Sequence, residues 1–526
     1  MSEEIKAWLK YWPKNVPKTI KYPPGPLHEL LEQVAHNYPK KVAVIYGEKE
    51  ITYKQLEDTS NQFADALIKL GIRRGDRVAI FLPNIPQFII AYFGILKAGG
   101  VVTTISPLHR EREVEYQLSN SGAQAIVILD TLFSVLENVK RKTSLKHVIV
   151  TRLDEWGFTQ LLEAVSCDRP NVEINPSTDL AALQYSGGTT GTAKGVMLTH
   201  TNLVSNALAF SSMIEGSSQD TFLIALPLFH IYGMTTSMNV PIRLAATMVL
   251  LPKFETDKVL ELIQKHRVTV FCGVPTMYSI LLTNPNLTKY DLTSIRVCIS
   301  GASSLPPHVQ KRFMEVTGGL LAEGYGLTEA SPVTHCTPVD TSISLRVGSI
   351  GLPLPNTDAK IVDIETGKKV VDVNEIGELA IKGPQIMKGY WQNPEETRLV
   401  LRDRWLLTGD IARMDTDGYF YIVDRKKDLI KHNGYSVYPR ELEEVLYEHP
   451  AVRLCAVVGK PDPASGELPV AFVVLKEGAQ ATEEDLKKFV NGKVAAYKSL
   501  RIIRFVGDLP MSAAGKVQKR ILKEHL

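Results

Sequence analysis

The sequence predicts an α/β protein with a large N-terminal lobe of doubly wound sheets and a small α+β C-terminal domain. Three observations carry this prediction. Short β-branched or apolar runs alternate with helix-length stretches through the first two thirds of the chain, and several of these runs end in loops rich in Gly, Pro, Ser or Thr. The pattern then changes after about residue 420. Strands separated by helix-length connections imply βαβ units and a largely parallel sheet.

The first part of the chain sets up the alternation. Strands are expected at Arg77–Leu82, Val101–Thr104 and Ala125–Leu129. Between them, Pro86–Lys97 is expected to form a helix with proline in its first turn, and Arg110–Ser119 is a second polar-apolar stretch of helix length. These elements predict the first parallel sheet.

The middle third contains five further strands, each followed by a loop of small or hydroxyl residues. The expected strands are Asp179–Tyr185, Thr221–Leu226, Val268–Cys272, Ser294–Ser300 and Leu320–Ala322. The loops are Ser186–Gly195, Pro227–Gly233, Gly273–Thr276, Gly301–Ser304 and Gly324–Glu329. Because ligands of doubly wound sheets bind beyond the carboxyl ends of the strands, we expect these five loops to line one crevice.

The last hundred residues form a separate block. A strand at Tyr419–Val423 leads into the charged connector Asp424–Asp428. The block then contains a proline-started helix at Pro439–Tyr447, strands at Leu454–Val458, Val470–Leu475 and Ile502–Val506, and a helix capped by Thr482. We expect two domains, residues 1–425 and 426–526, since the block has the size of a small domain.

The composition excludes several classes of protein. Of 526 residues, 44% are hydrophobic, and 60 basic against 57 acidic side chains give a formal net charge of +3, so no nucleic-acid or anionic-lipid surface is expected. Five cysteines without a CxxC pair argue against a disulfide scaffold or a cysteine zinc site. The N-terminal residues lack the apolar core of a signal peptide, and the apolar run Phe88–Leu96 is too short to cross a bilayer. A soluble cytoplasmic enzyme without a transmembrane segment is expected.

The segment from Ser186 to Gly195 is the strongest chemical signal. It combines four glycines, four hydroxyls and Lys194. Glycines let backbone N–H groups approach phosphate oxygens, and the hydroxyls and the lysine add donors and positive charge. It is not a Walker A loop, because Ala193 and Gly195 stand where that motif needs Gly and Ser or Thr. The segment predicts a phosphate site, with a plain glycine-rich turn as the alternative.

With this loop, the sequence resembles the AMP-forming acyl- and aryl-CoA synthetases of the adenylate-forming superfamily, and most resembles their medium- and long-chain fatty-acid CoA ligases. The resemblance covers nearly the whole chain and rests on several motifs in the family order. Ala193 departs from it, since the family most often has proline before the lysine. The resemblance implies a distorted barrel within the large lobe and a mobile C-terminal domain.

The segment Glu323–Glu329 is expected to clamp a nucleotide. Tyr325 offers an aromatic face for a base, Thr328 a donor for a phosphate, and Glu329 a carboxylate for Mg²⁺. Asp410, in Thr408-Gly-Asp410, is a carboxylate of the kind that binds ribose hydroxyls in many nucleotide sites. The resemblance implies that Asp410 and Arg425 both contact the ribose, with a surface turn and a salt bridge as the alternative. With the resemblance, the expected ATP and AMP contacts are Ser186, Gly187, Gly188, Thr189, Thr190, Gly191, Thr192, Lys194, Gly301, Ala302, Glu323, Gly324, Tyr325, Gly326, Thr328, Asp410 and Arg425.

A lysine near the C-terminus completes the expected chemistry. Lys516 lies in a Pro510–Lys516 loop between a strand and the terminal helix, and a lysine ammonium is suited to neutralising oxyanions as a carboxylate attacks the α-phosphorus. In the resembled family the matching lysine is required for adenylate formation. The resemblance implies catalytic roles for Lys516, His230, Thr190 and Glu329, with Glu329 as the metal ligand.

Other matched positions are expected to bind the acyl and CoA groups. The resemblance places Ile231, Tyr232, Met234, Pro332 and Val333 in the acyl pocket, Lys431 and Gly434 beside CoA, and Lys427 at the hinge between the domains. The apolar pocket favours fatty or aryl acids over amino acids. Some long-chain members have a tryptophan shortly after the histidine, whereas this chain has Met234 there, which favours medium chains. Gly377–Leu379 and Lys388–Trp391 match family motifs and are expected to be mainly structural.

The predicted function is ATP-dependent activation of a medium- or long-chain fatty acid to acyl-AMP and pyrophosphate, followed by transfer to CoA. ATP, Mg²⁺ and CoA are the expected small molecules beside the carboxylic acid. The alternatives are another acid of the 4-coumarate type, a carrier-protein acceptor, light emission as in the related luciferases, a non-catalytic binder, and a kinase-like phosphotransferase that releases ADP. A homodimer and a lysine acetyltransferase acting on Lys516 are further expected partners.

Overall fold

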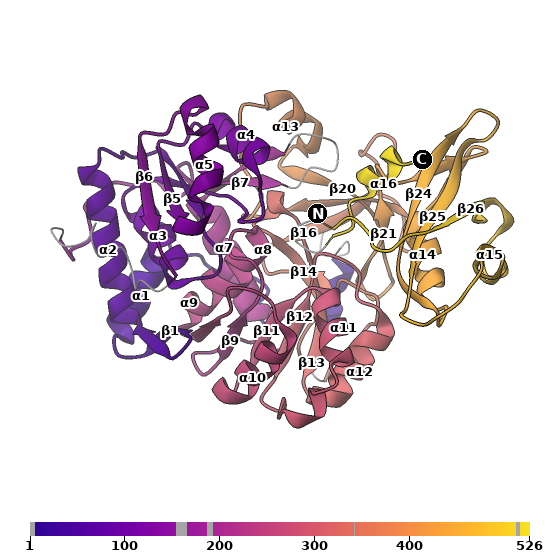
Figure 1. The fold of residues 1–526 in the computed structure, drawn as a ribbon, viewed down its shortest axis with the longest axis horizontal. Coiled ribbons are helices and arrows are strands. Elements are labelled where there is room, and N and C mark those ends of the chain that lie inside the picture. Colours follow the sequence, from indigo (N-terminus) through magenta and orange to yellow (C-terminus); the bar gives the residue numbers. More distant parts are fainter. Residues whose placement is uncertain (1–5, 154–165, 187–192, 341, 512–515) are drawn as a thin grey trace.

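The computed structural model describes residues 6–153, 166–186, 193–340, 342–511 and 516–526. Four sheets organise these residues, three in a larger lobe that extends to residue 425 and one in a C-terminal block of residues 430–526 (Figure 1). Within the described ranges, no helix has both the length and the apolar run needed to cross a membrane.

The largest sheet of the larger lobe has nine strands and is parallel through its centre. Four of the five strands expected in the middle third of the chain lie at the centre of this sheet. In spatial order the strands are β15 (Leu352–Pro353), β14 (Val333–Cys336), β13 (Leu320–Gly326), β12 (Val297–Ser300), β11 (Val270–Gly273), β9 (Thr221–Ile224), β10 (Thr247–Leu250), β1 (Val42–Tyr46) and β2 (Lys49–Thr52).

The second sheet has seven strands and contains the first part of the chain. Its order is β18 (Gly389–Tyr390), β8 (Lys194–Thr199), β7 (Leu180–Ser186), β4 (Val101–Thr104), β3 (Arg77–Phe81), β5 (Ala125–Leu129) and β6 (His147–Thr151). Strand β7 is thus in a different sheet from β9, β11, β12 and β13, and it pairs antiparallel with β8. The five loops expected to line one crevice therefore follow strands of two sheets, and the site is built from more than one sheet.

A third sheet lies next to the C-terminal block. It is antiparallel, with the order β16 (Asp358–Val362), β17 (Gly377–Lys382), β20 (Trp405–Met414) and β19 (Leu401–Arg402), and β21 (Phe420–Arg425) pairs with β20. The resemblance implied a distorted barrel in this lobe. The structure has a five-stranded antiparallel sheet in this part of the lobe. It carries Asp410 and Arg425 on neighbouring strands.

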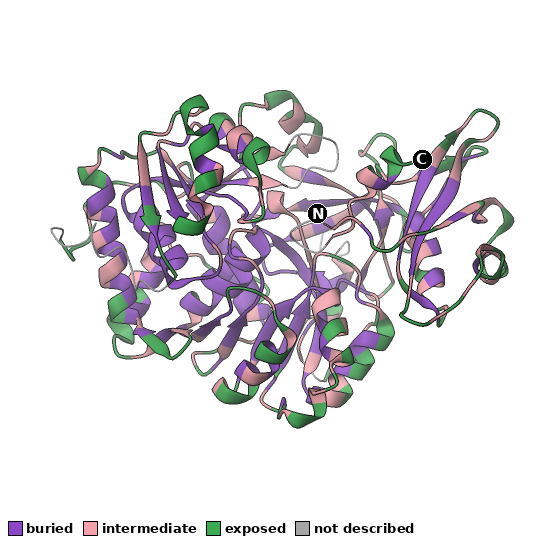
Figure 2. Ribbon diagram, viewed as in Figure 1, coloured by how far each residue is buried: buried purple, intermediate pink, exposed green. Residues whose placement is uncertain are grey.

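Helices cover the sheets of the larger lobe, with their inner faces buried and their outer faces exposed (Figure 2). Pro86–Lys97 is a helix with the predicted bounds, and every one of its residues is buried. The helices are α1 (Glu29–Asn37), α2 (Tyr53–Lys69), α3 (Pro86–Lys97), α4 (Glu111–Ser121), α5 (Phe133–Val139), α7 (His200–Met213), α8 (Ile231–Met234), α9 (Val240–Leu244), α10 (Thr256–His266), α11 (Pro275–Thr283), α12 (Pro307–Thr317) and α13 (Pro394–Val400).

The C-terminal block has its own sheet and two apolar clusters, one on each face. Its strands are β23 (Tyr435–Val437), β22 (Ile430–His432), β25 (Gly466–Leu475), β24 (Val452–Asp462) and β26 (Ile502–Phe505). Its helices are α14 (Pro439–Tyr447), α15 (Glu483–Asn491) and α16 (Lys519–Glu524), of which α16 lies between this sheet and the larger lobe (Figure 1). The predicted cap is confirmed, because the Thr482 hydroxyl accepts the Asp485 N–H at 3.1 Å.

Candidate active site

The end of strand β13 places the expected base-binding tyrosine. Gly326 is required here, because a Cβ at this position would lie 2.2 Å from the carbonyl oxygen of Pro332. The close approach turns the chain into a short 3₁₀ turn, Thr328–Ala330, which carries Glu329. The Tyr325 hydroxyl donates a hydrogen bond to Asp410 Oδ2, so two predicted nucleotide contacts meet across two sheets.

Asp410 and Arg425 face each other on adjacent strands of the third sheet. The Arg425 guanidinium lies 3.4 Å from Asp410 Oδ1, and the electrostatic attraction of this carboxylate raises the pKa of Arg425. Asp410 therefore forms an ion pair with the Arg425 guanidinium through Oδ1 and accepts a hydrogen bond from the Tyr325 phenol at Oδ2. Vicinal hydroxyls of a sugar could replace these partners without leaving the carboxylate unpaired.

The structure brings Lys516 to this pair from the C-terminal block. Burial, together with the positive charges of Arg425 and Lys427, lowers the pKa of Lys516 to about 8, although the carboxylates of Asp410 and Glu329 oppose this shift. Lys427 has the same surroundings, and burial together with the Arg425 charge also lowers its pKa to about 8. Three cations thus converge near two carboxylates, an arrangement that favours the binding of a polyanion.

The glycine-rich segment closes the hairpin between β7 and β8. Ser186 and Lys194 are paired across it, while the predicted contacts Gly187, Gly188, Thr189, Thr190, Gly191 and Thr192 lie outside the described residues. The Lys194 ammonium forms an ion pair with Glu396 and lies 5.2 Å from the centre of the Tyr390 ring. Glu396 therefore holds Lys194 at the base of the hairpin.

Tyr390 is a site residue that the sequence analysis missed. Its hydroxyl donates to Glu329 Oε1 at 2.8 Å, and strand β18 attaches it to β8 beside Lys194. The motif Lys388–Trp391 was expected to be mainly structural, because an isolated Gly-Tyr pair gives no sign of the carboxylate it will meet. Its register against β8 is a contact between segments about two hundred residues apart, which sequence spacing alone does not reveal.

The donor set at Glu329 fits a magnesium ion that is shared with a substrate. In the described part of the chain, no group of three or more His, Cys, Asp and Glu side chains is arranged to hold a metal by itself. Mg²⁺ commonly uses one or two carboxylates and completes its coordination with substrate phosphates and water. The single carboxylate of Glu329, oriented by Tyr390 and near Lys516, matches that type of site.

The remaining predicted nucleotide contacts lie at the ends of β12 and β13. These strands are neighbours, and Ser300 pairs with Glu323 just before Gly301 and Gly324. Ala302 has a φ of 71°, in the left-handed region. Glu323 is buried, which raises its pKa to about 7, and its Oε2 accepts the Leu305 N–H at 3.4 Å. The structure thus gathers Gly301, Ala302, Glu323 and Gly324 on one sheet edge, as expected.

His230 lies between the lysine and the expected acyl residues. Its Nδ1 accepts the Tyr232 N–H at 3.2 Å at the start of α8. Burial and the nearby Lys516 charge together lower the pKa of His230 to about 4, so the imidazole is neutral at physiological pH. Its neighbours Ile231, Tyr232 and Met234 on α8, and Pro332 and Val333 from the β13–β14 connection, are all buried.

Tyr232 connects the acyl and nucleotide residues. Its hydroxyl donates to the carbonyl oxygen of Ile299 at 2.9 Å, and a Cβ at Gly301 would lie 3.0 Å from its ring. The expected acyl residues therefore pack directly against the expected adenine edge. A carboxylate bound here would lie close to both His230 and the strand end at Gly301.

The two expected CoA contacts are elsewhere in the C-terminal block. Lys431 is exposed on β22, where its ammonium donates to the Ser436 hydroxyl at 2.9 Å. Gly434 lies in the turn between β22 and β23. The structure thus presents Lys516, rather than this turn, to the cluster around Asp410.

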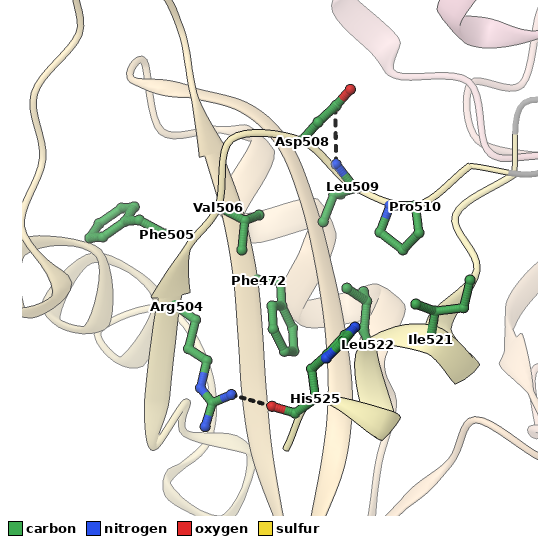
Figure 3. A pocket seen from close by; sticks show the side chains of 10 residues that line it. All are labelled: Phe472, Arg504, Phe505, Val506, Asp508, Leu509, Pro510, Ile521, Leu522 and His525. Atoms are coloured by element: carbon green, nitrogen blue, oxygen red, sulfur yellow. Dashed lines mark hydrogen bonds between the residues drawn. The ribbon is translucent and has the colours of Figure 1, made fainter.

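A cavity of about 780 Å³ lies on the C-terminal block, apart from the cluster around Asp410 (Figure 3). Apolar side chains of β25, β26 and α16 line most of it, with Arg504 and His525 at one end, where Arg504 donates to the His525 carbonyl oxygen. Leu509 and Pro510 on its rim begin the segment that carries Lys516. The cavity therefore borders the base of the lysine segment without containing any of the predicted site residues.

Comparison with known proteins accounts for this arrangement. The model of the AMP-binding enzyme family matches residues 31–391, and that of the AMP-binding enzyme C-terminal domain matches residues 441–516. A long-chain-fatty-acid–CoA ligase of Bacillus subtilis is 42% identical, covering 99% of this chain and 98% of the relative.

Solved structures agree with the sequence comparison. ATP-bound MatB from Rhodopseudomonas palustris superposes with a TM-score of 0.88 at 31% identity, covering 95% of this chain and 98% of that one. The anthranilate CoA ligase AuaEII in complex with anthranoyl-AMP gives a TM-score of 0.89 at 29% identity, covering 96% and 97%. From its N-terminal sheets to the lysine segment near its C-terminus, the chain belongs to the AMP-binding enzyme family.

Proposed function

We propose that this protein is an AMP-forming acid–thiol ligase that converts a fatty acid, ATP and CoA into acyl-CoA, AMP and pyrophosphate. The observation that carries the proposal is the position of Lys516, which the C-terminal block presents to Asp410, Arg425 and Glu329 of the larger lobe. Relatives that match over nearly the full length are named long-chain-fatty-acid–CoA ligases, which supports the same reaction.

In the first step, a carboxylate oxygen of the acid attacks the α-phosphorus of ATP, and pyrophosphate leaves with the electron pair of the broken P–O bond. Asp410 and Arg425 hold the ribose, and Tyr325 lies against the base. Lys516 and Lys194 offset the negative charge that gathers on the transferred group and the leaving group. Neutral His230 donates a hydrogen bond toward the incoming carboxylate, since its Nδ1 already accepts the Tyr232 N–H.

Glu329 is the residue that would hold Mg²⁺, together with the phosphates of ATP. When bound, the ion supplies positive charge to the triphosphate. Tyr390 fixes the Glu329 carboxylate through its hydroxyl, and Thr328 in the same turn offers a donor to a phosphate oxygen.

In the second step, the thiolate of CoA attacks the acyl carbon of the adenylate, and AMP leaves. Lys516 is not needed here, because no triphosphate reacts in this step. We take residues 1–425 and 426–526 as the two domains, with Lys427 as the hinge about which the smaller domain turns. That rotation withdraws Lys516 and presents Lys431 and Gly434 to the pantetheine arm.

The proposed acid is a fatty acid of medium to long chain. The buried apolar residues around α8 offer no charged partner to an ammonium group, which disfavours amino acids. The names of the relatives favour long chains, whereas Met234 favours medium ones. An aryl acid of the 4-coumarate type, or a carrier-protein acceptor, is the alternative within the same chemistry.

One assay tests the reaction. The protein is given ATP, Mg²⁺ and saturated fatty acids of graded length, with and without CoA, and 4-coumarate as the aryl control. We expect AMP and pyrophosphate only with a fatty acid, and thioester only when CoA is added. Release of ADP, or AMP formation that needs no acid, contradicts the proposal.

Three further expectations belong with this proposal: a homodimer, a cytoplasmic location and acetylation of Lys516 by a lysine acetyltransferase. Acetylation removes the charge of Lys516 and should silence adenylate formation. Full activity of a completely acetylated sample contradicts that last expectation.

A further inference from the structure

Lys519, three residues after Lys516, is half-buried near the junction of the C-terminal block with the larger lobe, and the proposed reaction gives it no role. It is the first residue of α16, and its side chain is 18% exposed. Its ammonium lies 2.7 Å from Glu443 Oε1. Burial alone would lower the pKa of Lys519, but Glu443, Asp424 and Asp428 together raise it, so the lysine stays charged.

Glu443 is held in place by its own domain. It belongs to α14, and its Oε1 also accepts the Val457 N–H of strand β24 at 2.7 Å. A carboxylate with a backbone donor on one side and an ammonium on the other is a fixed anchor. Glu443 therefore joins α16 to α14 and to the sheet of the C-terminal block.

Asp424 brings the larger lobe into the same cluster. It is the penultimate residue of β21, which pairs with β20 of the third sheet, and it is 6% exposed. Its Oδ2 accepts the Arg440 N–H of α14 at 2.8 Å, and its Oδ1 accepts the Arg425 N–H at 2.7 Å. Burial raises the pKa of Asp424 to about 6, and the charge of Lys519 opposes that rise.

The hydrogen bond from the Arg440 N–H to Asp424, and the electrostatic attraction between Asp424 and Lys519, both span the connector Asp424–Asp428. Asp424 precedes the proposed hinge at Lys427, while Arg440, Glu443 and Lys519 follow it. Rotation of the smaller domain about the hinge separates Asp424 from these partners. The cluster is therefore specific to the orientation in which Lys516 faces Asp410.

Lys519 is also mechanically tied to the segment that carries Lys516. The Gln518 N–H donates to the Pro510 carbonyl oxygen at 2.8 Å, and the Gln518 side chain donates to the Met511 carbonyl oxygen at 2.9 Å. Met511 and Val517 form a β-bridge across the base of the segment. Because Lys516 and Lys519 are separated by only about 10 Å of extended chain, fixing one restricts the other.

We propose that Lys519 is a positioning residue that, with Asp424 and Glu443, latches the C-terminal domain in the adenylate-forming orientation. The latch keeps Lys516 at the cluster around Asp410 during the first half-reaction and opens when the domain turns for the second. This inference rests on the proposed two-step function and adds a residue that acts on Lys516 rather than on the substrates.

The first test separates the two half-reactions in Lys519→Met, which keeps the length of the side chain and removes its charge. We expect adenylate formation to fall about tenfold, because the charge that pairs with Glu443 and attracts Asp424 across the interface is lost. Thioester formation from supplied acyl-adenylate should stay within twofold of the unsubstituted protein. Lys519→Arg should recover most of the first step, and Lys523→Met, at an exposed position of the same helix, should change neither step.

The second test needs no substrate. Hydrogen exchange of the peptide containing Arg440 reports the bond to Asp424, so Lys519→Met should speed exchange there and leave strands β24 and β25 unchanged. If the unsubstituted protein forms no adenylate, the proposed function is wrong. The exchange measurement still tests the latch, because it does not depend on the reaction. Equal loss of both half-reactions in Lys519→Met, full adenylate formation, or unchanged exchange at Arg440 overturns the latch.

Discussion

In the larger lobe, Tyr325, Asp410 and Arg425 lie on strands of extensive sheets, and hydrogen bonds and ion pairs within that lobe fix them. In the C-terminal block, Lys516 lies beyond the last strand, in a segment held by α16 and by charged contacts across a connector. The larger lobe thus binds with groups that stay in place, whereas the smaller block delivers a charge that must move. Substitutions in the two regions should therefore have different effects on the half-reactions and on stability.

Lys516→Ala should give the largest effect on the reaction. Loss of one preorganised charge at the transferring group is expected to lower adenylate formation by about a hundred- to a thousandfold. Thioester formation from supplied acyl-adenylate should be nearly unchanged. Single-turnover measurement of each half-reaction checks both statements, with Lys523→Ala, at an exposed position of the helix that follows, as the control.

A comparable loss in both half-reactions would contradict this division of roles between the two regions, because Lys516 would then serve the fixed binding site rather than only the first step.

Lys97→Met tests the opposite behaviour in the larger lobe. Lys97 is fully buried in α3, 2.7 Å from Glu57 Oε2, and it also donates to Ser60 and Asn61. Removing it leaves a buried carboxylate unpaired, which should cost about 3–5 kcal/mol of the free energy of unfolding. Both half-reactions per folded molecule should be unchanged, as measured by denaturant unfolding and active-site titration.

The exposed pair Lys142–Glu115 provides the matched control, and Lys142→Met should change stability by less than about 1 kcal/mol. A selective loss of one half-reaction in Lys97→Met would show that the larger lobe also takes part in the domain movement.

Tyr390→Phe should have an intermediate effect. The substitution removes the hydroxyl that donates to Glu329 and leaves the ring beside Lys194. A hydrogen bond to a charged group is worth about a factor of ten, so adenylate formation should fall about tenfold and need more Mg²⁺ for half-maximal rate. Tyr435→Phe, at an exposed position of the C-terminal block, should have no effect. An unchanged Mg²⁺ requirement would separate Tyr390 from the metal ligand.

Much of the fold could be predicted because its signals are local. The bounds of Pro86–Lys97, Val101–Thr104 and Pro439–Tyr447 follow from apolar runs and first-turn prolines, and the structure has them unchanged. The sequence did not reveal that the five loops follow strands of two different sheets, because the partner of a strand is set by packing far along the chain. Strand β7 looks like its parallel neighbours in sequence, but it forms a hairpin with β8.

The same distinction applies to the site. Tyr325 and Asp410 were predicted from residue types that match a chemical task, and Arg425 and Lys516 from the family resemblance. The structure brings these four together. Tyr390, Glu396 and Lys519 were missed because their importance comes from partners distant in sequence: Glu329, Lys194 and Asp424. An ordinary tyrosine, glutamate or lysine on a short element carries no local sign of such a partner.

The pH dependence of the first step should give the smallest effect and the most direct view of Lys516. Because its pKa is lowered to about 8, the lysine is charged below that pH and loses its charge as the pH rises through it. The value of kcat/KM for ATP in adenylate formation should therefore fall about threefold from pH 7.5 to 8.5, as expected for a single titrating group. Lys516→Arg keeps a charge at every accessible pH and should flatten this decline while lowering the maximum rate. If the decline persists in Lys516→Arg, the titrating group is Lys427, whose pKa is also lowered to about 8, and the charge that limits the reaction then belongs to the hinge rather than to the delivered segment.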